Sequence, residues 1–148
     1  MNKPRIGLVG VGLMGHGIAL NIARKGYALA VLEHPGNQPL DELRALGVTS
    51  AATVQALARQ VQVLILCVTG SPQVEAVLLG EQGALAALQP GTVVIDCSTA
   101  IPASTESVAR AVAAAGGRFL DAPMTRTPKE AAEGRLNLLV GGDAALLA

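Results

Sequence analysis

The stretch that predicts the fold reads Ile6-Gly7-Leu8-Val9-Gly10-Val11-Gly12-Leu13-Met14-Gly15. A short apolar strand ends in a glycine-spaced turn, and apolar residues at helical spacing follow at once. In such a turn Gly10 makes the tight bend, Gly12 lets the backbone approach a pyrophosphate, and Gly15 lets helix and strand pack closely. The phosphates would lie at the helix N-terminus, where free N–H groups and the helix dipole favour negative charge. The spacing therefore predicts a dinucleotide-binding turn.

An acidic residue closes the second apolar strand, predicted over Ala28–Glu33. Glu33 lies close to the offset of roughly 20 residues at which an acid binds the adenosine ribose in this kind of turn. A carboxylate there accepts hydrogen bonds from the ribose hydroxyls and repels a 2′-phosphate, which predicts NAD rather than NADP. His34 follows, and a protonated imidazole would tolerate a phosphate, so NADP is not excluded. The alternative for Glu33 is a solvated residue at a strand end.

Length and charge limit the classes of protein that remain. The 148 residues suffice for one domain with a sizeable core. Eleven basic and eleven acidic residues cancel without forming a basic stripe, so nucleic acid is not an expected partner. No apolar run approaches the roughly 20 residues that cross a bilayer, and the N-terminus has no signal-peptide pattern. We expect a soluble, cytoplasmic protein without a membrane partner.

Two cysteines each fall at the end of an apolar strand and form no C-x-x-C motif. Cys67 and Cys97 are therefore expected to be buried, reduced thiols that pack as small apolar groups. With two cysteines and two scattered histidines, no metal site is expected.

Strands and helices alternate along the chain, which favours a parallel sheet covered on both faces. The expected strands are Arg5–Val9, Ala28–Glu33, Val61–Val68, Thr92–Asp96, Arg118–Asp121 and Leu136–Val140. The expected helices are Met14–Lys25, Asp41–Leu46, Thr53–Gln60, Pro72–Leu79, Pro102–Ala115 and Pro128–Glu133. Thr53 and Ser71 are expected N-caps. The predicted fold class is α/β, a Rossmann-type, doubly wound and mostly parallel sheet with helices on both faces.

The last residues resemble the start of a further element. Gly141 and Gly142 are typical of a turn, Asp143 of an N-cap, and the residues after it of the first turn of an apolar helix. A folded domain rarely ends one turn into a helix, so residues 1–148 are expected to be the N-terminal domain of a longer protein.

Four segments of the chain resemble the β-hydroxyacid dehydrogenases, a family that includes 3-hydroxyisobutyrate dehydrogenase and tartronate semialdehyde reductase. The segments are Gly7–Gly15 with its Met-Gly ending, Cys67–Val74, Asp96–Thr99 and Asp121–Met124. The likeness runs along the whole chain in order. It implies reversible hydride transfer between a nicotinamide and the hydroxyl-bearing carbon of a small acid.

The resemblance also implies roles for single residues. The pyrophosphate would be covered by Val11, Gly12, Leu13 and Met14, and Glu33 would take the ribose. Val68 and Thr69 would border the nicotinamide with Thr99 nearby, and Ser98 would hydrogen-bond the substrate. These positions suit a ligand, because open α/β sheets bind ligands beyond the carboxyl ends of their strands. The alternative for Ser98 and Thr99 is a capped turn before the next helix.

In this family a lysine on a long helix after the present domain acts as general acid and base. The matching region lies past residue 148, and Lys129 is not a substitute, since it fits a solvated helix start better. This chain is therefore expected to bind dinucleotide while holding an incomplete catalytic site. The resemblance further implies a helical C-terminal domain through which the protein forms a homo-oligomer.

One departure from the family pattern concerns the substrate. Where most members have Ser-Gly-Gly, this chain has Thr125-Arg126-Thr127. A planar guanidinium suits carboxylate, sulfonate or phosphate oxygens, and the pattern resembles the sulfolactaldehyde reductase branch. Together with Ser98, these three residues are the candidate substrate contacts for a small anionic substrate. The alternative is that Arg126 pairs with Glu130 or Glu133 on the surface.

Two other functions stay open at this point. An imine reductase uses the same glycine turn, although Arg126 would oppose a cationic iminium. A dinucleotide-binding module without catalysis would need no lysine.

Overall fold

Seven strands form one sheet in the computed structural model of the chain, which describes residues 3–124, 131–133 and 141–142. The strands are β1 (Ile6–Val9), β2 (Leu29–Leu32), β3 (Thr49–Ala51), β4 (Val63–Leu66), β5 (Val93–Asp96), β6 (Arg118–Asp121) and β7 (Gly141–Gly142). The helices are α1 (Leu13–Arg24), α2 (Asp41–Ala45), α3 (Val54–Arg59), α4 (Ser71–Leu79), α5 (Pro102–Ala114) and the 3-10 helix η1 (Ala84–Ala87).

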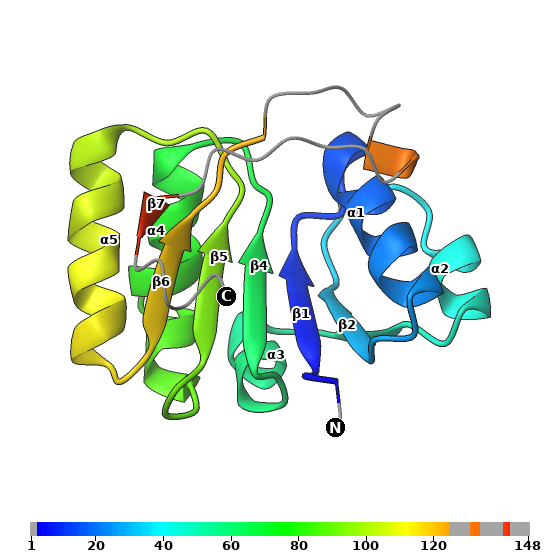
Figure 1. Ribbon diagram of the computed structural model, residues 1–148, viewed down its shortest axis with the longest axis horizontal. Coiled ribbons are helices and arrows are strands. Elements are labelled where there is room, and N and C mark those ends of the chain that lie inside the picture. Colours follow the sequence, from blue (N-terminus) through cyan, green and yellow to red (C-terminus); the bar gives the residue numbers. More distant parts are fainter. Residues whose placement is uncertain (1–2, 125–130, 134–140, 143–148) are drawn as a thin grey trace.

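The strand order is β3-β2-β1-β4-β5-β6-β7 (Figure 1). All pairs from β3 to β6 are parallel, and β7 is antiparallel to β6. The first strand lies between β2 and β4, so the chain reverses its direction of winding there. Ligands of open α/β sheets bind at such a switch point, outside the carboxyl ends of the strands. The predicted Rossmann-type sheet is confirmed.

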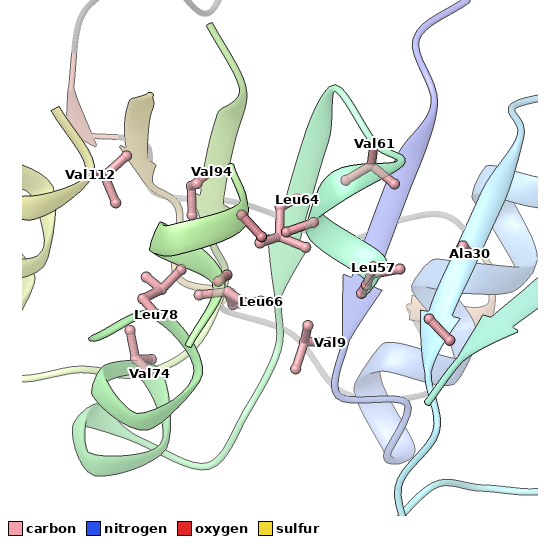
Figure 2. Close-up of a cluster of buried hydrophobic side chains, with 14 of the residues drawn as sticks. Val9, Ala30, Leu57, Val61, Leu64, Leu66, Val74, Leu78, Val94 and Val112 are labelled. Atoms are coloured by element: carbon pink, nitrogen blue, oxygen red, sulfur yellow. The ribbon is translucent and has the colours of Figure 1, made fainter. Parts of the chain in front are cut away.

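Two apolar clusters hold the sheet between its helices. One cluster joins the sheet to α3, α4, α5 and η1 (Figure 2). The other joins it to α1 and α2. The neighbours Leu8 and Val9 belong to different clusters and are both buried, at 0% and 3% exposure. Burial on both faces is why β1 reads as a continuous apolar run rather than an alternating one.

Several elements differ from the sequence prediction. The β3 strand and η1 were not predicted. Both are short, with three and four residues, and the first two residues of β3 are not buried. Gly141 and Gly142, expected to form a turn, pair with Asp121 and Leu120 as β7. The strand predicted over Val61–Val68 is shorter, since only Val63–Leu66 pairs as β4. The strand expected over Leu136–Val140 lies outside the described residues, as does the start of the helix expected over 128–133.

One of the two predicted caps is confirmed and one is wrong. The Thr53 hydroxyl accepts a hydrogen bond from the N–H of Ala56 at 3.0 Å and caps α3. Ser71 instead lies inside α4, whose N-cap is Gly70. Its Oγ accepts a hydrogen bond from the N–H of Ile101 at 2.7 Å, so it ties the start of α4 to that of α5.

No helix in the part of the chain that the structure describes is long and apolar enough to cross a membrane.

Candidate functional site

The glycine turn connects β1 to α1 through very close backbone contacts. Gly10 has a φ of 100°, and a Cβ there would lie 2.0 Å from the carbonyl oxygen of Cys67. A Cβ on Gly15 would lie 1.8 Å from the carbonyl oxygen of Gly10. No side chain fits at either position without a backbone shift. These two glycines therefore serve the approach of α1 to the strands β1 and β4.

Gly12 differs from its two neighbours in the motif. A Cβ built on Gly12 would meet nothing within 4 Å among the described residues. Gly12 is the N-cap of the 12-residue α1, it provides no side-chain cap, and the first turn holds no acidic residue. The N–H groups at a helix N-terminus need partners. The space beside Gly12 therefore suits an anion, as the pyrophosphate of a dinucleotide would be.

The other residues of the turn contribute differently. Val11 is fully buried, and its carbonyl oxygen accepts a hydrogen bond from the N–H of Gln38 at 2.7 Å. Leu13 is 66% exposed, and Met14 is half-buried. Val11 thus presents no surface to a ligand, whereas the side chain of Leu13 is free to contact one. The bond from Gln38 holds the loop after β2 against the turn.

The loop after β2 borders a cleft of about 520 Å³. It is lined by Glu33, His34, Pro35, Asn37, Gln38, Pro39, Leu40, Arg44 and Ala52. Its volume is typical of small-molecule sites, which span about 300–1,000 Å³. Glu33, the predicted ribose ligand, is exposed there, directly after β2. Its Oε1 accepts a hydrogen bond from the Ser50 hydroxyl at 2.9 Å.

His34 lies beside Glu33 but is engaged locally. Its Nδ1 accepts a hydrogen bond from the N–H of Gly36 at 2.9 Å. A doubly protonated imidazole has no acceptor nitrogen. The protonated His34 that would tolerate a phosphate would therefore lose this hydrogen bond.

The loops after β4 and β5 are joined by a serine. Asp96 Oδ1 accepts a hydrogen bond from the N–H of Ser98 at 2.9 Å, and Ser98 Oγ accepts one from the N–H of Val68 at 2.8 Å. Ser98 is only 3% exposed, while Thr69 and Thr99 on the two loops are exposed. The Ser98 hydroxyl thus braces the loop that carries Val68 and Thr69. Its assignment as a substrate ligand stays a prediction.

Asp96 is the most unusual polar group of this region. Its side chain is fully buried, and Oδ2 has no hydrogen-bond partner in the structure's described part. Burial raises the pKa of this carboxyl group, and the hydrogen bonds from Ser98 offset part of the rise. Asp121 is its register partner on β6. Burial and, second, the charge of Asp96 raise the pKa of Asp121 as well.

Both cysteines are free thiols next to this carboxyl group. Burial, with Asp96 nearby, raises the pKa of Cys67 to about 11. Burial, followed by Cys67, Asp96 and Asp121, raises the pKa of Cys97 to about 12. Cys97 is buried as predicted, whereas Cys67 is only partly so. Nucleophilic chemistry needs the thiolate, so these neutral thiols have a packing role. Nowhere in the described ranges do three His, Cys, Asp or Glu side chains gather as a metal site.

The candidate substrate contacts Thr125, Arg126 and Thr127 lie outside the described residues. The chain that follows them is described at 131–133, where it packs on α1. Asn21 Nδ2 donates hydrogen bonds to the carbonyl oxygens of Gly17 at 2.8 Å, Ala131 at 2.7 Å and Ala132 at 3.1 Å. Asn21 therefore holds residues 131 and 132 against α1.

Gly17 provides the room for this contact and was missed in the sequence. A Cβ on Gly17 would lie 2.6 Å from the backbone nitrogen of Ala132. Ala131 is 2% exposed beside it. A glycine inside a helix costs about 1 kcal/mol relative to alanine, which calls for a packing reason. That cost was the signal available in the sequence. Gly17 and Asn21 therefore fasten residues 131–133, which follow the candidate substrate contacts in the chain, to the helix of the glycine turn.

A Gly17→Ala variant should release residues 131–133 from α1, because the added methyl group overlaps their backbone. Asn21→Ala should weaken the same contact by removing the donor of two hydrogen bonds to it. Each change is expected to speed amide hydrogen exchange at 131–133 by about tenfold, the equivalent of one to two lost hydrogen bonds. His16→Ala, on the same helix, is the control. Unchanged exchange at 131–133 in both variants would refute this contact.

Residues 5–148 match the family model described as the NAD binding domain of 6-phosphogluconate dehydrogenase. The 2-hydroxy-3-oxopropionate reductase of Escherichia coli K12 is 37% identical over 142 residues, which cover 96% of this chain and 48% of that protein. The NAD-dependent L-serine dehydrogenase of Pseudomonas aeruginosa PAO1 is 35% identical over 143 residues, which cover 97% of this chain and 48% of that protein. This chain thus spans about half the length of these relatives.

Solved structures likewise match this chain over about half of their own length. A 3-hydroxyisobutyrate dehydrogenase of Mycobacterium tuberculosis, with L-serine, superimposes with a TM-score of 0.88 at 26% identity, over 99% of this chain and 49% of that one. Psf3 in complex with NADP+ superimposes with a TM-score of 0.85 at 29% identity, over 95% of this chain and 50% of that one. An imine reductase of Myxococcus stipitatus with NAD+ has a TM-score of 0.86, over 99% and 49% of the two chains, but 23% identity. That last likeness concerns the fold alone.

Proposed function

The chain belongs to the β-hydroxyacid dehydrogenase family, as an NAD-binding domain of the 6-phosphogluconate dehydrogenase type, and from this we propose its function. It is the cofactor-binding part of an oxidoreductase that uses NAD. That enzyme transfers a hydride between the nicotinamide and the hydroxyl-bearing carbon of a small anionic β-hydroxy acid or its semialdehyde.

The observation that carries the proposal is the space beside Gly12, where a Cβ would meet no atom of the described residues within 4 Å. Within that part of the chain the N-terminus of α1 is open, and a neighbouring cleft holds Glu33. A pyrophosphate suits the first site by charge, and ribose hydroxyls suit the carboxylate of the second. Thr69 and Thr99 are exposed on the loops after β4 and β5, where the nicotinamide would border the substrate. The bound cofactor would supply the hydride acceptor or donor, and these residues would orient it.

The substrate class follows from Arg126 and from the relatives. Hydroxyoxopropionate and serine, named in the two relatives, each carry a carboxylate next to a short chain. A guanidinium binds such a group through paired hydrogen bonds. We propose that Arg126 anchors the carboxylate or sulfonate of the substrate, with Ser98, Thr125 and Thr127 as further contacts. Proton transfer would then fall to a lysine of a helical domain beyond residue 148, through which the protein would also assemble as a homo-oligomer.

The test has two stages. The present chain should bind NAD in a calorimetric titration. The full-length protein should then oxidise or reduce members of a panel of carboxylated and sulfonated hydroxy acids. In that protein Arg126→Ala is expected to raise the KM for the substrate about tenfold or more, the equivalent of a lost charge-assisted pair, with NAD affinity unchanged. Arg118→Ala, on the exposed start of β6, is the control.

Four outcomes would contradict the proposal. Rates confined to uncharged alcohols, or an unchanged KM in Arg126→Ala, would remove the anion anchor. Binding of NAD with no turnover of any panel member would favour a module without catalysis. Failure to bind either dinucleotide would remove the cofactor site itself.

A further inference from the structure

Ser50 touches the acid that the cofactor site depends on. It is the central residue of β3 and pairs in register with Val31 of β2. Its hydroxyl donates to Oε1 of Glu33 at 2.9 Å, and the N–H of Glu33 donates to the carbonyl oxygen of Ala51 at 2.9 Å. The backbone and the side chain of Glu33 are thus both tied to the neighbouring strand.

This bond matters because Glu33 is otherwise an exposed, flexible side chain. Ordering a glutamate costs up to about 1.5–2 kcal/mol of side-chain entropy. If the carboxylate is already held in place before a ligand arrives, this entropy cost does not weaken the binding of the ligand. The bond from Ser50 occupies one acceptor position of Oε1. A carboxylate has about four such positions, so enough remain for two ribose hydroxyls.

The same cleft also holds a positive charge. Arg44 of α2 lines it together with Glu33. Within the described residues the Arg44 guanidinium forms no ion pair, since the one salt bridge there joins Arg24 to Glu42. A guanidinium is the group best suited to a phosphate ester. The cleft therefore contains a carboxylate that rejects a 2′-phosphate and a cation that would accept one.

We propose that Ser50 is a positioning residue that holds Glu33 in place and thereby sets the preference of the site for NAD over NADP. The inference rests on the proposed dinucleotide binding. With Ser50 present, the negative charge stays at the end of β2, where the ribose hydroxyls would reach it. Without the hydroxyl, Glu33 is free to move away. The attraction between Arg44 and a 2′-phosphate would then have a larger effect on whether NAD or NADP binds.

The experiment measures dissociation constants for NAD and NADP by calorimetry on the chain itself. Ser50→Ala is expected to lower the ratio of NAD to NADP affinity about threefold to tenfold, the range for loss of one hydrogen bond. Ser50→Thr keeps a hydroxyl and should restore most of the ratio. In a Glu33→Gln background, Ser50→Ala should change the ratio by less than twofold. Thr49→Ala, at an exposed neighbouring position of β3, is the matched control. Thermal melting establishes that each variant is folded.

The outcomes separate this inference from the function it rests on. If the parent chain binds neither dinucleotide, the proposed function fails and this inference falls with it. If the parent binds NAD and Ser50→Ala keeps the parent's ratio, only the role of Ser50 is overturned. The role of Ser50 is also overturned if Ser50→Ala lowers the ratio of NAD to NADP affinity as much in the Glu33→Gln background as in the parent, because Ser50 would then act through another group. Three results together support the role of Ser50. The ratio of NAD to NADP affinity falls in Ser50→Ala and recovers in Ser50→Thr. In the Glu33→Gln background, Ser50→Ala leaves that ratio nearly unchanged.

Discussion

Gly12→Ala is expected to fold like the parent chain and to bind NAD about tenfold to 100-fold more weakly. A Cβ at this position meets no atom of the described residues within 4 Å, and Gly12 has a negative φ of −82°. The methyl group therefore costs the free protein little. With dinucleotide bound it would occupy the space at the N-terminus of α1. Overlaps of this size cost about 1–3 kcal/mol, and each 1.4 kcal/mol is a factor of ten in affinity.

Gly15→Ala is the contrasting variant at the same turn. Its Cβ would lie 1.8 Å from the carbonyl oxygen of Gly10, so α1 must move away from β1. We expect a loss of about 3 kcal/mol in unfolding free energy, at the upper end of overpacking costs. Urea unfolding and calorimetric titration of both variants make the comparison. The roles assigned to the two glycines would be wrong if Gly12→Ala unfolded early or if Gly15→Ala kept the stability of the parent.

The second large effect concerns Asp96 and depends on pH. Its carboxyl group is fully buried, and Oδ2 lacks a partner among the described residues. Burial raises the pKa in the folded state above its ordinary value of 3.8. The folded protein therefore holds this proton more tightly than the unfolded chain does. Ionised Asp96 lowers stability at neutral pH, and this penalty disappears as the pH falls through the folded pKa toward 3.8.

Asp96→Asn removes the charge and keeps an oxygen that accepts from the N–H of Ser98. The difference in unfolding free energy between this variant and the parent should shift in favour of the variant as the pH rises from about 4 to 7. We expect a shift of about 1–3 kcal/mol, the cost of an unsatisfied buried group. The two amide hydrogens of asparagine change the unfolding free energy of the variant by an amount that does not depend on pH. Urea unfolding at several pH values measures the trend.

Asp96→Ala provides the control for the hydrogen bond itself. It removes the charge together with the acceptor of the Ser98 N–H. It should therefore show the same pH trend but be less stable than Asp96→Asn by about 1–3 kcal/mol at every pH. Parallel curves for the parent and both variants would mean that Asp96 does not titrate differently in the folded and unfolded states.

Much of the fold was predictable because its signals are local. The turn Gly10–Gly15 combines a strand, a tight bend and a helix start within one stretch, and each part restricts the backbone on its own. The apolar run around Val63–Leu66 predicts a strand, which the structure has as β4, although Val63 and Ile65 on one face are only half-buried. The Thr53 cap needs only the N–H of a residue three positions later. The position of Glu33 at the carboxyl end of β2 follows from the strand that precedes it.

What escaped prediction depends on partners distant in the sequence. Ser71 has the pattern of an N-cap, but its hydroxyl bonds to Ile101 on another element. Gly141 and Gly142 suit a turn, yet they pair with β6. The contact of Gly17 with Ala132 joins α1 to the segment after the predicted substrate residues. Local propensity contains no information on these neighbours.

The sequence by itself therefore determined the class of fold, the glycine turn and the position of Glu33, the candidate ribose ligand, at the end of β2, since each is set by residues close along the chain. Only the tertiary structure decided what surrounds them. It placed Ser50 against Glu33. Among the residues that the structure describes, it also left Gly12 open where Gly10 and Gly15 are closed, and it buried Asp96 without a partner for Oδ2. These properties arise when parallel strands bring together residues that are far apart in the chain, and strand pairing is settled by the burial of both faces of the sheet at once.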